Sequence, residues 1–183
     1  KYLQGYERDF IQTTKLCKMI TDQQIKMIFL SSGGTVYGNQ EIQPITEDAL
    51  PRPINHYGNV KLCIENTIRT FNYQAHTKIL IARISNPYGP GQDFNKGVGF
   101  IDAAIKKTIR SEKIEIWGDG NNVRDYIYID DVCRMLISLF YYQEDYDTFN
   151  ISSNTGTSQR DVIRMLEAMQ LAPQVEYLPA RSV

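Results

Sequence analysis

Tyr57 and Lys61 are the residues whose types and spacing could do chemistry. They are four positions apart, so on a helix they would lie on the same face, one turn apart. A free phenol has a pKa of about 10 and is a poor base at neutral pH. A nearby ammonium favours the phenolate and lowers that pKa, towards the range in which general acid–base catalysis is effective. The same spacing also occurs on ordinary solvated helix faces. The surrounding sequence is therefore needed to distinguish a catalytic pair from a solvated face.

Two apolar runs lie on either side of this pair in the sequence. Residues 26–30 are apolar apart from the first and lead into the small-residue loop 31–38, and residues 79–84 lead into a second loop, 85–91, with Asn-Pro and Gly-Pro steps. Such runs are typical of buried parallel strands. Ligand sites of open α/β sheets form beyond the carboxyl ends of such strands. A fourth polar and aromatic block follows at residues 118–132.

These four blocks, in this order, resemble the extended short-chain dehydrogenase/reductases, specifically the NAD-dependent nucleotide-sugar epimerases and dehydratases of the UDP-glucose 4-epimerase type. The resemblance runs from about residue 9 to Arg181. It implies an α/β fold: the C-terminal part of a Rossmann-type parallel sheet, incomplete, with a smaller α/β substrate-binding domain. The Gly-x-Gly-x-x-Gly turn of that family is not found in this sequence, since Gly97-Val98-Gly99 is followed at the third position by Asp102. We therefore expect a fragment that binds NAD weakly and is inactive by itself.

The expected organisation follows from this resemblance and from the apolar periodicity. Residues 1–92 are expected to be the remaining part of the NAD-binding domain. Residues 93–183 are expected to be mainly substrate-binding, with about 125–152 returning to the Rossmann sheet. The periodicity predicts helices at about 9–21, 56–73, 98–109, 130–142 and 158–169, and strands at 26–32, 79–84, 113–117, 125–129, 148–151 and 175–178.

The resemblance assigns the cofactor end of the site. It implies that Tyr57 is the acid–base and that Lys61 holds the nicotinamide ribose while lowering the pKa of the tyrosine. Pro87 and Tyr88 are expected beside the nicotinamide. Ser31 is a further expected cofactor contact.

The loop after the first strand departs from the family. The family has a serine or threonine three residues before Val-Tyr-Gly, where it hydrogen-bonds a sugar hydroxyl, and here that position is Gly33. Ser32 or Thr35 could substitute from the same loop, or Tyr57 could work without a hydroxyl partner. Hydrogen bonding within the loop is an equally good interpretation of Ser31 and Ser32.

Five residues are expected at the nucleotide sugar by the same resemblance. Asn86 and Arg124 would lie at the phosphates, Arg124 as a bidentate guanidinium. Trp117 would lie beside the base, and Val98 and Arg181 would also contact the sugar nucleotide. Three of the five have an ordinary alternative: a turn for Asn86, core packing for Trp117, and an ion pair with Asp125 or Asp119 for Arg124.

The loop also separates the reactions of the family. Its 4,6-dehydratases place an Asp-Glu pair directly before Val-Tyr-Gly, whereas this chain has Gly34-Thr35. Elimination of water without those carboxylates would forgo general acid–base help often worth about 10² to 10⁴ in rate. We therefore favour NAD-dependent epimerisation at C4 of a UDP-glucose/UDP-galactose type of substrate, in polysaccharide synthesis. A nucleotide-sugar dehydratase or keto-sugar reductase of the same family, and a non-catalytic sugar-nucleotide-binding module, remain the alternatives.

The composition limits which partners, cysteine chemistry and metal sites can be expected. The 183 residues carry 20 basic and 21 acidic side chains, a net charge of −1, which predicts neither a nucleic-acid nor a membrane-surface partner. Three scattered cysteines are typical of reduced core thiols in a cytoplasmic protein. The two histidines lack acidic or cysteine partners at ligand spacing, so no metal site is expected. By resemblance, the helices at about 9–21 and 56–73 would form a homodimer interface, with a UDP- or dTDP-hexose as the substrate.

Overall fold

The computed structural model describes residues 2–93 and 99–180. The chain divides into two compact units: the first runs to Ser85 and resumes over Asp130–Ile151, and the second comprises Asn86–Ile129 and the residues from Ser152 onwards. The divisions therefore fall at 85 and 130, where the sequence suggested 92 and about 125. The reason is local pairing, since β3 (Asn86–Tyr88) pairs with β5 (Val123–Tyr128) inside the second unit.

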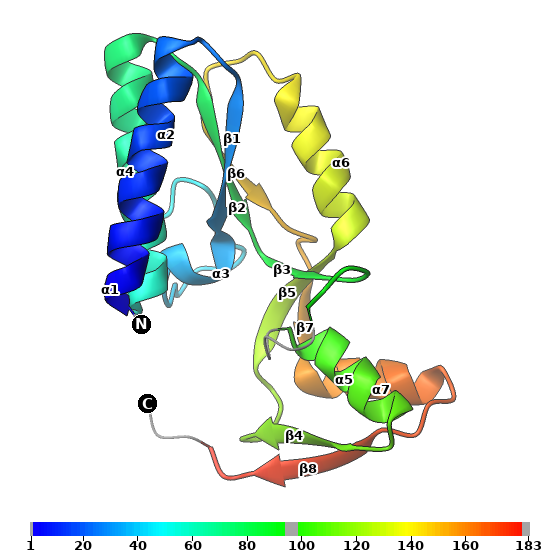
Figure 1. The fold of residues 1–183 in the computed structure, drawn as a ribbon. Helices are drawn as coiled ribbons and strands as arrows, with labels where there is room; N and C mark the ends of the chain where they lie inside the picture. The colour runs from blue at the N-terminus through cyan, green and yellow to red at the C-terminus, as the bar shows by residue number, and fades with distance from the viewer. Residues whose placement is uncertain (1, 94–98, 181–183) are drawn as a thin grey trace. The chain divides into compact units, whose positions relative to one another are not determined.

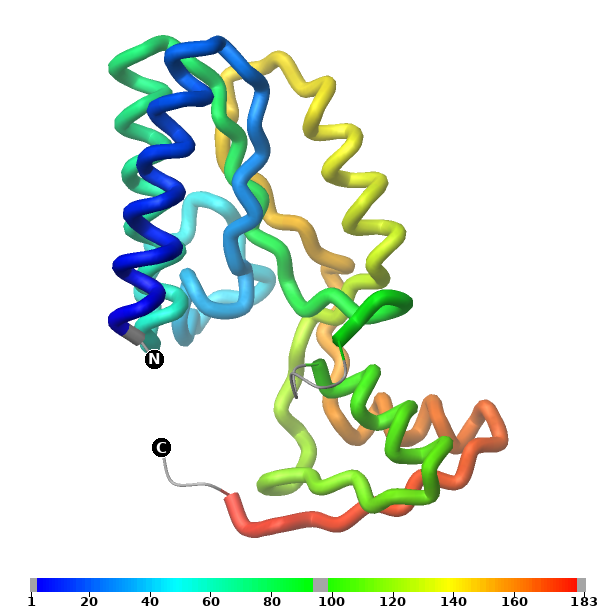
Figure 2. The backbone as a smooth tube through the Cα atoms, viewed as in Figure 1, coloured from blue at the N-terminus to red at the C-terminus, as the bar shows by residue number. Residues whose placement is uncertain are grey.

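The first unit is built on a parallel sheet with strand order β1-β2-β6. Its strands are β1 (Met27–Ser32), β2 (Ile79–Ile84) and β6 (Thr148–Ile151), all three expected from the sequence. The first five residues of β2 are buried, because helices lie on both faces of the sheet. Figures 1 and 2 show α2 (Ile11–Asp22) and α4 on one side and α6 on the other.

The long helices of this unit begin and end close to their expected limits. α4 covers His56–Ala75, and the side chain of its N-cap residue Asn55 accepts a hydrogen bond from the backbone N–H of Gly58 at 2.8 Å. α6 covers Ile129–Phe140. The N-terminal helix starts earlier than expected, because α1 (Tyr2–Gln4) and a π-helical segment (Gly5–Phe10) precede α2.

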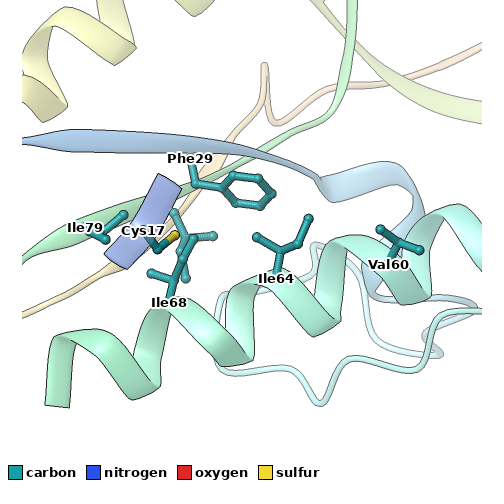
Figure 3. Close-up of a cluster of buried hydrophobic side chains, with 7 residues drawn as sticks. Cys17, Phe29, Val60, Ile64, Ile68 and Ile79 are labelled. Atoms are coloured by element: carbon teal, nitrogen blue, oxygen red, sulfur yellow. The ribbon is translucent and has the colours of Figure 1, made fainter. Parts of the chain in front are cut away.

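The core of the first unit lies between α2, α4 and the sheet (Figure 3). Ile64 and Ile68 of α4 pack against Phe29 of β1 and Cys17 of α2. Cys17 is the core thiol that the composition suggested, but Cys133 is exposed on α6 and is not a core residue. The reason is its position on the outer face of an amphipathic helix whose inner face buries Val132 and Leu139.

The second unit holds two smaller sheets and two helices. One sheet has the order β3-β5-β7, with β7 (Gly156–Ser158) antiparallel to β5; the other pairs β4 (Lys113–Trp117) with β8 (Gln174–Leu178) in parallel. α5 (Phe100–Ile109) and α7 (Gln159–Ala168) pack together with β4 around a core that includes Ile116 and Leu166. α7 opens with the expected capping box between Ser158 and Asp161.

Within residues 2–93 and 99–180, no helix combines the length and the apolar character that crossing a bilayer requires. In the same ranges, no group of three or more His, Cys, Asp or Glu side chains is gathered so as to hold a metal ion.

Candidate active site

Tyr57 and Lys61 lie on one open face of α4, in its first two turns. The Tyr57 side chain is 55% exposed, and both residues line a cavity of about 460 Å³ whose other wall is the π-helical segment, including Arg8 and Asp9. The helical spacing predicted from the sequence thus produces a shared face. A half-exposed phenol next to a cavity is accessible to a ligand.

Lys61 is held by the end of β1. Its ammonium donates a hydrogen bond to the backbone carbonyl of Leu30 at 2.9 Å and lies 4.9 Å from the ring centroid of Phe29. The same ammonium is 5.7 Å from the ring centroid of Tyr57. Burial lowers the pKa of the Lys61 ammonium, and the carboxylates of Asp9 and Glu65 act in the opposite direction.

The pKa of Tyr57 moves opposite to the expected direction. Burial raises the pKa of the phenol, and the negative charge of Asp9 raises it further, since both disfavour the phenolate. The expected lowering by Lys61 is therefore wrong for this chain as it stands. The physical reason is geometric: the ammonium lies near the ring face and donates to Leu30.

The small-residue loop expected after β1 contains one helical turn, α3 (Gly33–Val36). A Cβ atom at Gly33 would lie 3.1 Å from the carbonyl oxygen of Arg83 and 3.4 Å from that of Ile84. These contacts are tighter than side chains normally make, so β2 would have to shift to admit a serine here. The close packing of α3 on β2 thus favours glycine over serine at this position.

The three serine and threonine hydroxyls of this loop have different environments. Ser31 is buried and donates to the carboxylate of Glu65 at 2.5 Å, so its proton is not available to a cofactor. Ser32 is the N-cap of α3, but its side chain makes no capping hydrogen bond. Thr35 carries a buried Oγ1 with no hydrogen-bond partner among the described residues. Of the three, Thr35 has the hydroxyl that is buried and uncommitted.

Thr35 lies next to the helix that carries Tyr57. A Cβ atom at Gly58 would come within 2.5 Å of the Thr35 carbonyl oxygen and 3.1 Å of Pro53 Cβ. Only a glycine therefore permits the first turn of α4 to approach α3 this closely. Gly58 therefore lets the backbone of the phenol-bearing turn pack against the backbone carbonyl of Thr35.

The second unit contains a separate polar cavity of about 190 Å³. Three expected residues of the loop after β2, namely Asn86, Pro87 and Tyr88, line it together with Arg124 of β5. The Asn86 amide donates to the backbone carbonyl of Asp125 at 2.9 Å, which fixes β3 on β5. Six residues that were not expected from the sequence complete the lining: Gly99, Phe100, Ile101, Asn122, Tyr126 and Gln159.

Arg124 is available at this cavity. Its guanidinium donates to its neighbour's carbonyl, that of Val123, at 3.1 Å. The expected competitors are engaged elsewhere: Asp125 accepts from the backbone N–H groups of Ser153 and Thr155, and Asp119 accepts from Asn121.

Trp117 is the one remaining expected substrate contact among the described residues. Trp117 ends β4, is partly exposed and is paired in register with Leu178 of β8; it does not line the cavity. Val98 and Arg181 lie outside the described residues.

Some of the missed residues carried a usable signal. Arg124 and Tyr126 are two apart on a strand, so period-two alternation places both on the same face. Gln159 is the first residue of α7, directly after a capping serine, but nothing in its spacing connects it with Arg124. Asp9 is 48 residues from Tyr57 in sequence, and only the fold brings it to the same cavity.

Comparison with known proteins agrees with this architecture. The model of the NAD dependent epimerase/dehydratase family matches residues 3–152. The dTDP-4-dehydro-6-deoxyglucose reductase of Escherichia coli is 36% identical over 78% of this chain and 45% of its own length. The crystal structure of UDP-glucose 4-epimerase with UDP-glucose from Thermotoga maritima superposes with a TM-score of 0.92 at 30% identity, over all of this chain and 60% of that one. The UDP-glucose 4-epimerase of Thermus thermophilus in complex with NAD gives a TM-score of 0.86 at 26% identity, over 96% and 58% of the two chains.

The chain thus spans about half to three-fifths of the length of these relatives. The family model covers most of it, including α4 with Tyr57 and Lys61, the loop after β1, and Arg124. Together with the parallel sheet and the tyrosine–lysine face, this match shows that the chain belongs to the NAD dependent epimerase/dehydratase family.

Proposed function

We propose that this chain contributes the catalytic face and part of the substrate site of an enzyme that epimerises C4 of a nucleotide-diphosphate hexose, of the UDP-glucose/UDP-galactose type, through a transient 4-keto sugar. The single observation that carries the proposal is the exposed face of α4, where Tyr57 and Lys61 share a cavity. The backbone carbonyl of Thr35 lies against the same turn of the helix, and the Thr35 hydroxyl is buried without a partner among the described residues.

The residues present fit the nicotinamide-ribose end of NAD. Lys61 offers an ammonium and Tyr57 a phenol from one accessible helix face, and both are hydrogen-bond donors suited to ribose hydroxyls. NAD supplies the acceptor and, later, the donor of the hydride at C4. The Ser31 hydroxyl does not belong to this set, because it already donates its hydrogen bond to the carboxylate of Glu65.

The protein's own part is to move one proton and to orient the sugar. Tyr57 removes the proton of the 4-hydroxyl as the C4–H bond gives up its hydride, and it returns that proton when the hydride comes back to the other face of the keto sugar. Thr35, in place of the hydroxyl that Gly33 lacks, donates a hydrogen bond to the same oxygen. Lys61 favours the phenolate electrostatically once a ligand draws its ammonium towards the phenol.

The cavity of the second unit supports a nucleotide-diphosphate substrate. Arg124 supplies a planar guanidinium suited to paired phosphate oxygens, and Asn86, Asn122 and Gln159 add amide groups. Among the described residues, the lining contains one cation and no carboxylate, which favours an anionic ligand.

A 4-keto-sugar reductase is the second candidate. It is favoured by the relative of that activity, 36% identical to this chain, and it would use the same Tyr57, now as an acid towards the keto oxygen. A dehydratase is disfavoured, because Gly34 and Thr35 stand where carboxylates would be needed.

We also infer a cytoplasmic setting, with a role in polysaccharide synthesis. Nucleotide sugars are its proposed substrates, and the cysteines Cys17, Cys63 and Cys133 are all free thiols, as expected in a reducing compartment.

The function is tested with the full-length protein, NAD and a panel of UDP- and dTDP-hexoses, with C4 followed by proton NMR. Interconversion of gluco and galacto forms supports the epimerase. Turnover only of 4-keto-6-deoxy sugars with added NADH or NADPH would replace it by the reductase. Binding of the sugar nucleotides without turnover of any kind would leave a non-catalytic binding module.

A further inference from the structure

A buried ionic network lies behind the catalytic face of α4. Its centre is Glu65, one helical turn after Lys61, with a side chain that is fully buried. One carboxylate oxygen accepts from the Ser31 hydroxyl at 2.5 Å and from Arg83 Nε at 3.1 Å. The other accepts from Arg83 Nη2 at 2.7 Å and from Arg69 Nη2 at 3.2 Å. The carboxylate is therefore saturated with charged and neutral donors.

Stability alone does not explain such a network. Removing a carboxylate and a guanidinium from water costs several kcal/mol per ion, and replacing a buried pair by apolar residues is often neutral or stabilising. Arg83 is only 2% exposed, so the penalty applies in full to this pair. A network in which every group is bonded does, however, fix the relative positions of the elements that it joins.

The elements joined here are those that carry the site. Lys61 donates to the Leu30 carbonyl, and Glu65 accepts from Ser31, the next residue. α4 is thus fastened to two consecutive residues at the carboxyl end of β1. Arg83 extends the network to the loop after α3, because its Nη1 donates to the Tyr37 hydroxyl at 2.8 Å.

We propose that Glu65, held by Arg83, is a positioning residue that fixes the Tyr57–Lys61 face of α4 against the end of β1. The inference rests on the proposed function. Glu65 touches no reacting atom in it and acts through Lys61. The charged and titratable groups that face Lys61 from the packed elements are Arg8 and Asp9 of the π-helical segment and His56, Tyr57 and Glu65 of its own helix.

The test compares the full-length, NAD-loaded protein with its Glu65→Gln variant, which keeps the shape and removes the charge. We expect kcat to fall by about 10²-fold, the effect of a displacement on the order of 1 Å, while the KM for the nucleotide sugar stays within about twofold. The alkaline limb of the kcat profile should move to lower pH, since loss of Glu65 lowers the pKa of Lys61. Asp22→Asn removes the carboxylate of an exposed i,i+4 pair with Lys18 and is the matched control. It should change neither kcat nor its pH profile.

A second readout does not depend on turnover. Lysines are ¹³C-methylated, the Lys61 signal is assigned with Lys61→Arg, and its titration is followed by NMR; Glu65→Gln should shift it to lower pH. If Glu65→Gln does not fold, Glu65→Met/Arg83→Met removes the pair without leaving a lone buried charge and should show the same loss and shift. An unchanged Lys61 titration, with kcat falling only as the folded fraction falls, overturns the inference. A wild-type protein without turnover overturns the proposed function instead, and the titration still decides the role of Glu65.

Discussion

At the scale of single residues, the phenol of Tyr57 is the group on which the proposed chemistry depends. Tyr57→Phe removes one oxygen from a half-exposed side chain, so folding and sugar-nucleotide binding should be nearly unchanged. Turnover should fall by about 10² to 10⁴, the usual contribution of a positioned acid–base. Steady-state kinetics and calorimetric titration with UDP-hexoses check the two halves of this expectation, and full turnover by the variant would contradict the assignment.

Thr35 offers a sharper prediction, because its effects on stability and activity should have opposite signs. Its Oγ1 is buried without a partner among the described residues, so Thr35→Val should leave the free energy of unfolding unchanged or raise it. Loss of the proposed hydrogen bond from Thr35 to the sugar oxygen should nevertheless lower kcat by about 10- to 100-fold. That is the effect of a hydrogen bond of about 1.5–3 kcal/mol to a charged group. Urea unfolding and initial rates measure the two quantities.

Thr21 provides the matched control for that experiment. Its Oγ1 is also buried without a partner in the described part of the chain, but it lies near the C-terminal end of α2. Thr21→Val should reproduce the effect on unfolding and leave kcat alone. Equal losses of activity in both variants would show that the Thr35 effect is structural.

Asp9 makes the pH dependence testable. Its charge raises the pKa of Tyr57, so Asp9→Asn should lower that pKa. Because the phenolate is the proton acceptor, the acid limb of the epimerase rate profile should move to lower pH. A phenolate absorbance titration, corrected with Tyr57→Phe, measures the same change without turnover, and a shift to higher pH would refute it.

At the scale of elements, the approach of α4 to α3 rests on one glycine. Gly58→Ala would drive a Cβ atom to 2.5 Å from the Thr35 carbonyl oxygen, and overpacking of this kind costs about 1–3 kcal/mol. We expect urea unfolding to show that loss, together with reduced turnover. Gly5→Ala is the control, since its Cβ would meet Val60 at an ordinary 3.6 Å; a comparable loss there would show that the effect is not specific to Gly58.

Periodicity predicted the elements that bury a continuous apolar stripe. The strands β1, β2, β4 and β6 and the helices α4 and α7 were predicted within two residues at either end, because each shows a continuous apolar run or apolar residues at the period of the element. α3, β3 and β7 were missed. Each has three or four residues and is held by contacts distant in sequence, as when the Asn86 side chain fixes β3 on β5. Such elements have no period of their own.

In the candidate site, too, some features were predictable from local spacing and others depend on residues distant in sequence. The shared face of Tyr57 and Lys61 follows from local spacing, and the sequence predicted it. The commitment of Ser31 to Glu65, 34 residues away, and the sign of the Tyr57 pKa shift depend on burial and on distant charges. No local pattern carries that information.

At the scale of the whole molecule, the expected homodimer remains a proposal that large exposed apolar side chains support. Ile11, Leu16 and Met19 of α2 are all more than 40% exposed. In the full-length protein, Leu16→Glu/Met19→Glu should convert a dimer into a monomer in sedimentation velocity, because two charges would be buried in the interface. Ile137→Glu, at an exposed position of α6, is the control and should leave the sedimentation unchanged.

The order of the first sheet has a consequence for handling this chain. Among the described residues, β1 pairs only with β2, so the other side of β1 presents a row of backbone N–H and C=O groups at the margin of the sheet. Leu30 on this strand is also 46% exposed. Open strands of this kind template the addition of further strands and are a common origin of aggregation. Residues 1–183 expressed by themselves should therefore be prone to self-association through β1, and the associated fraction should rise with protein concentration.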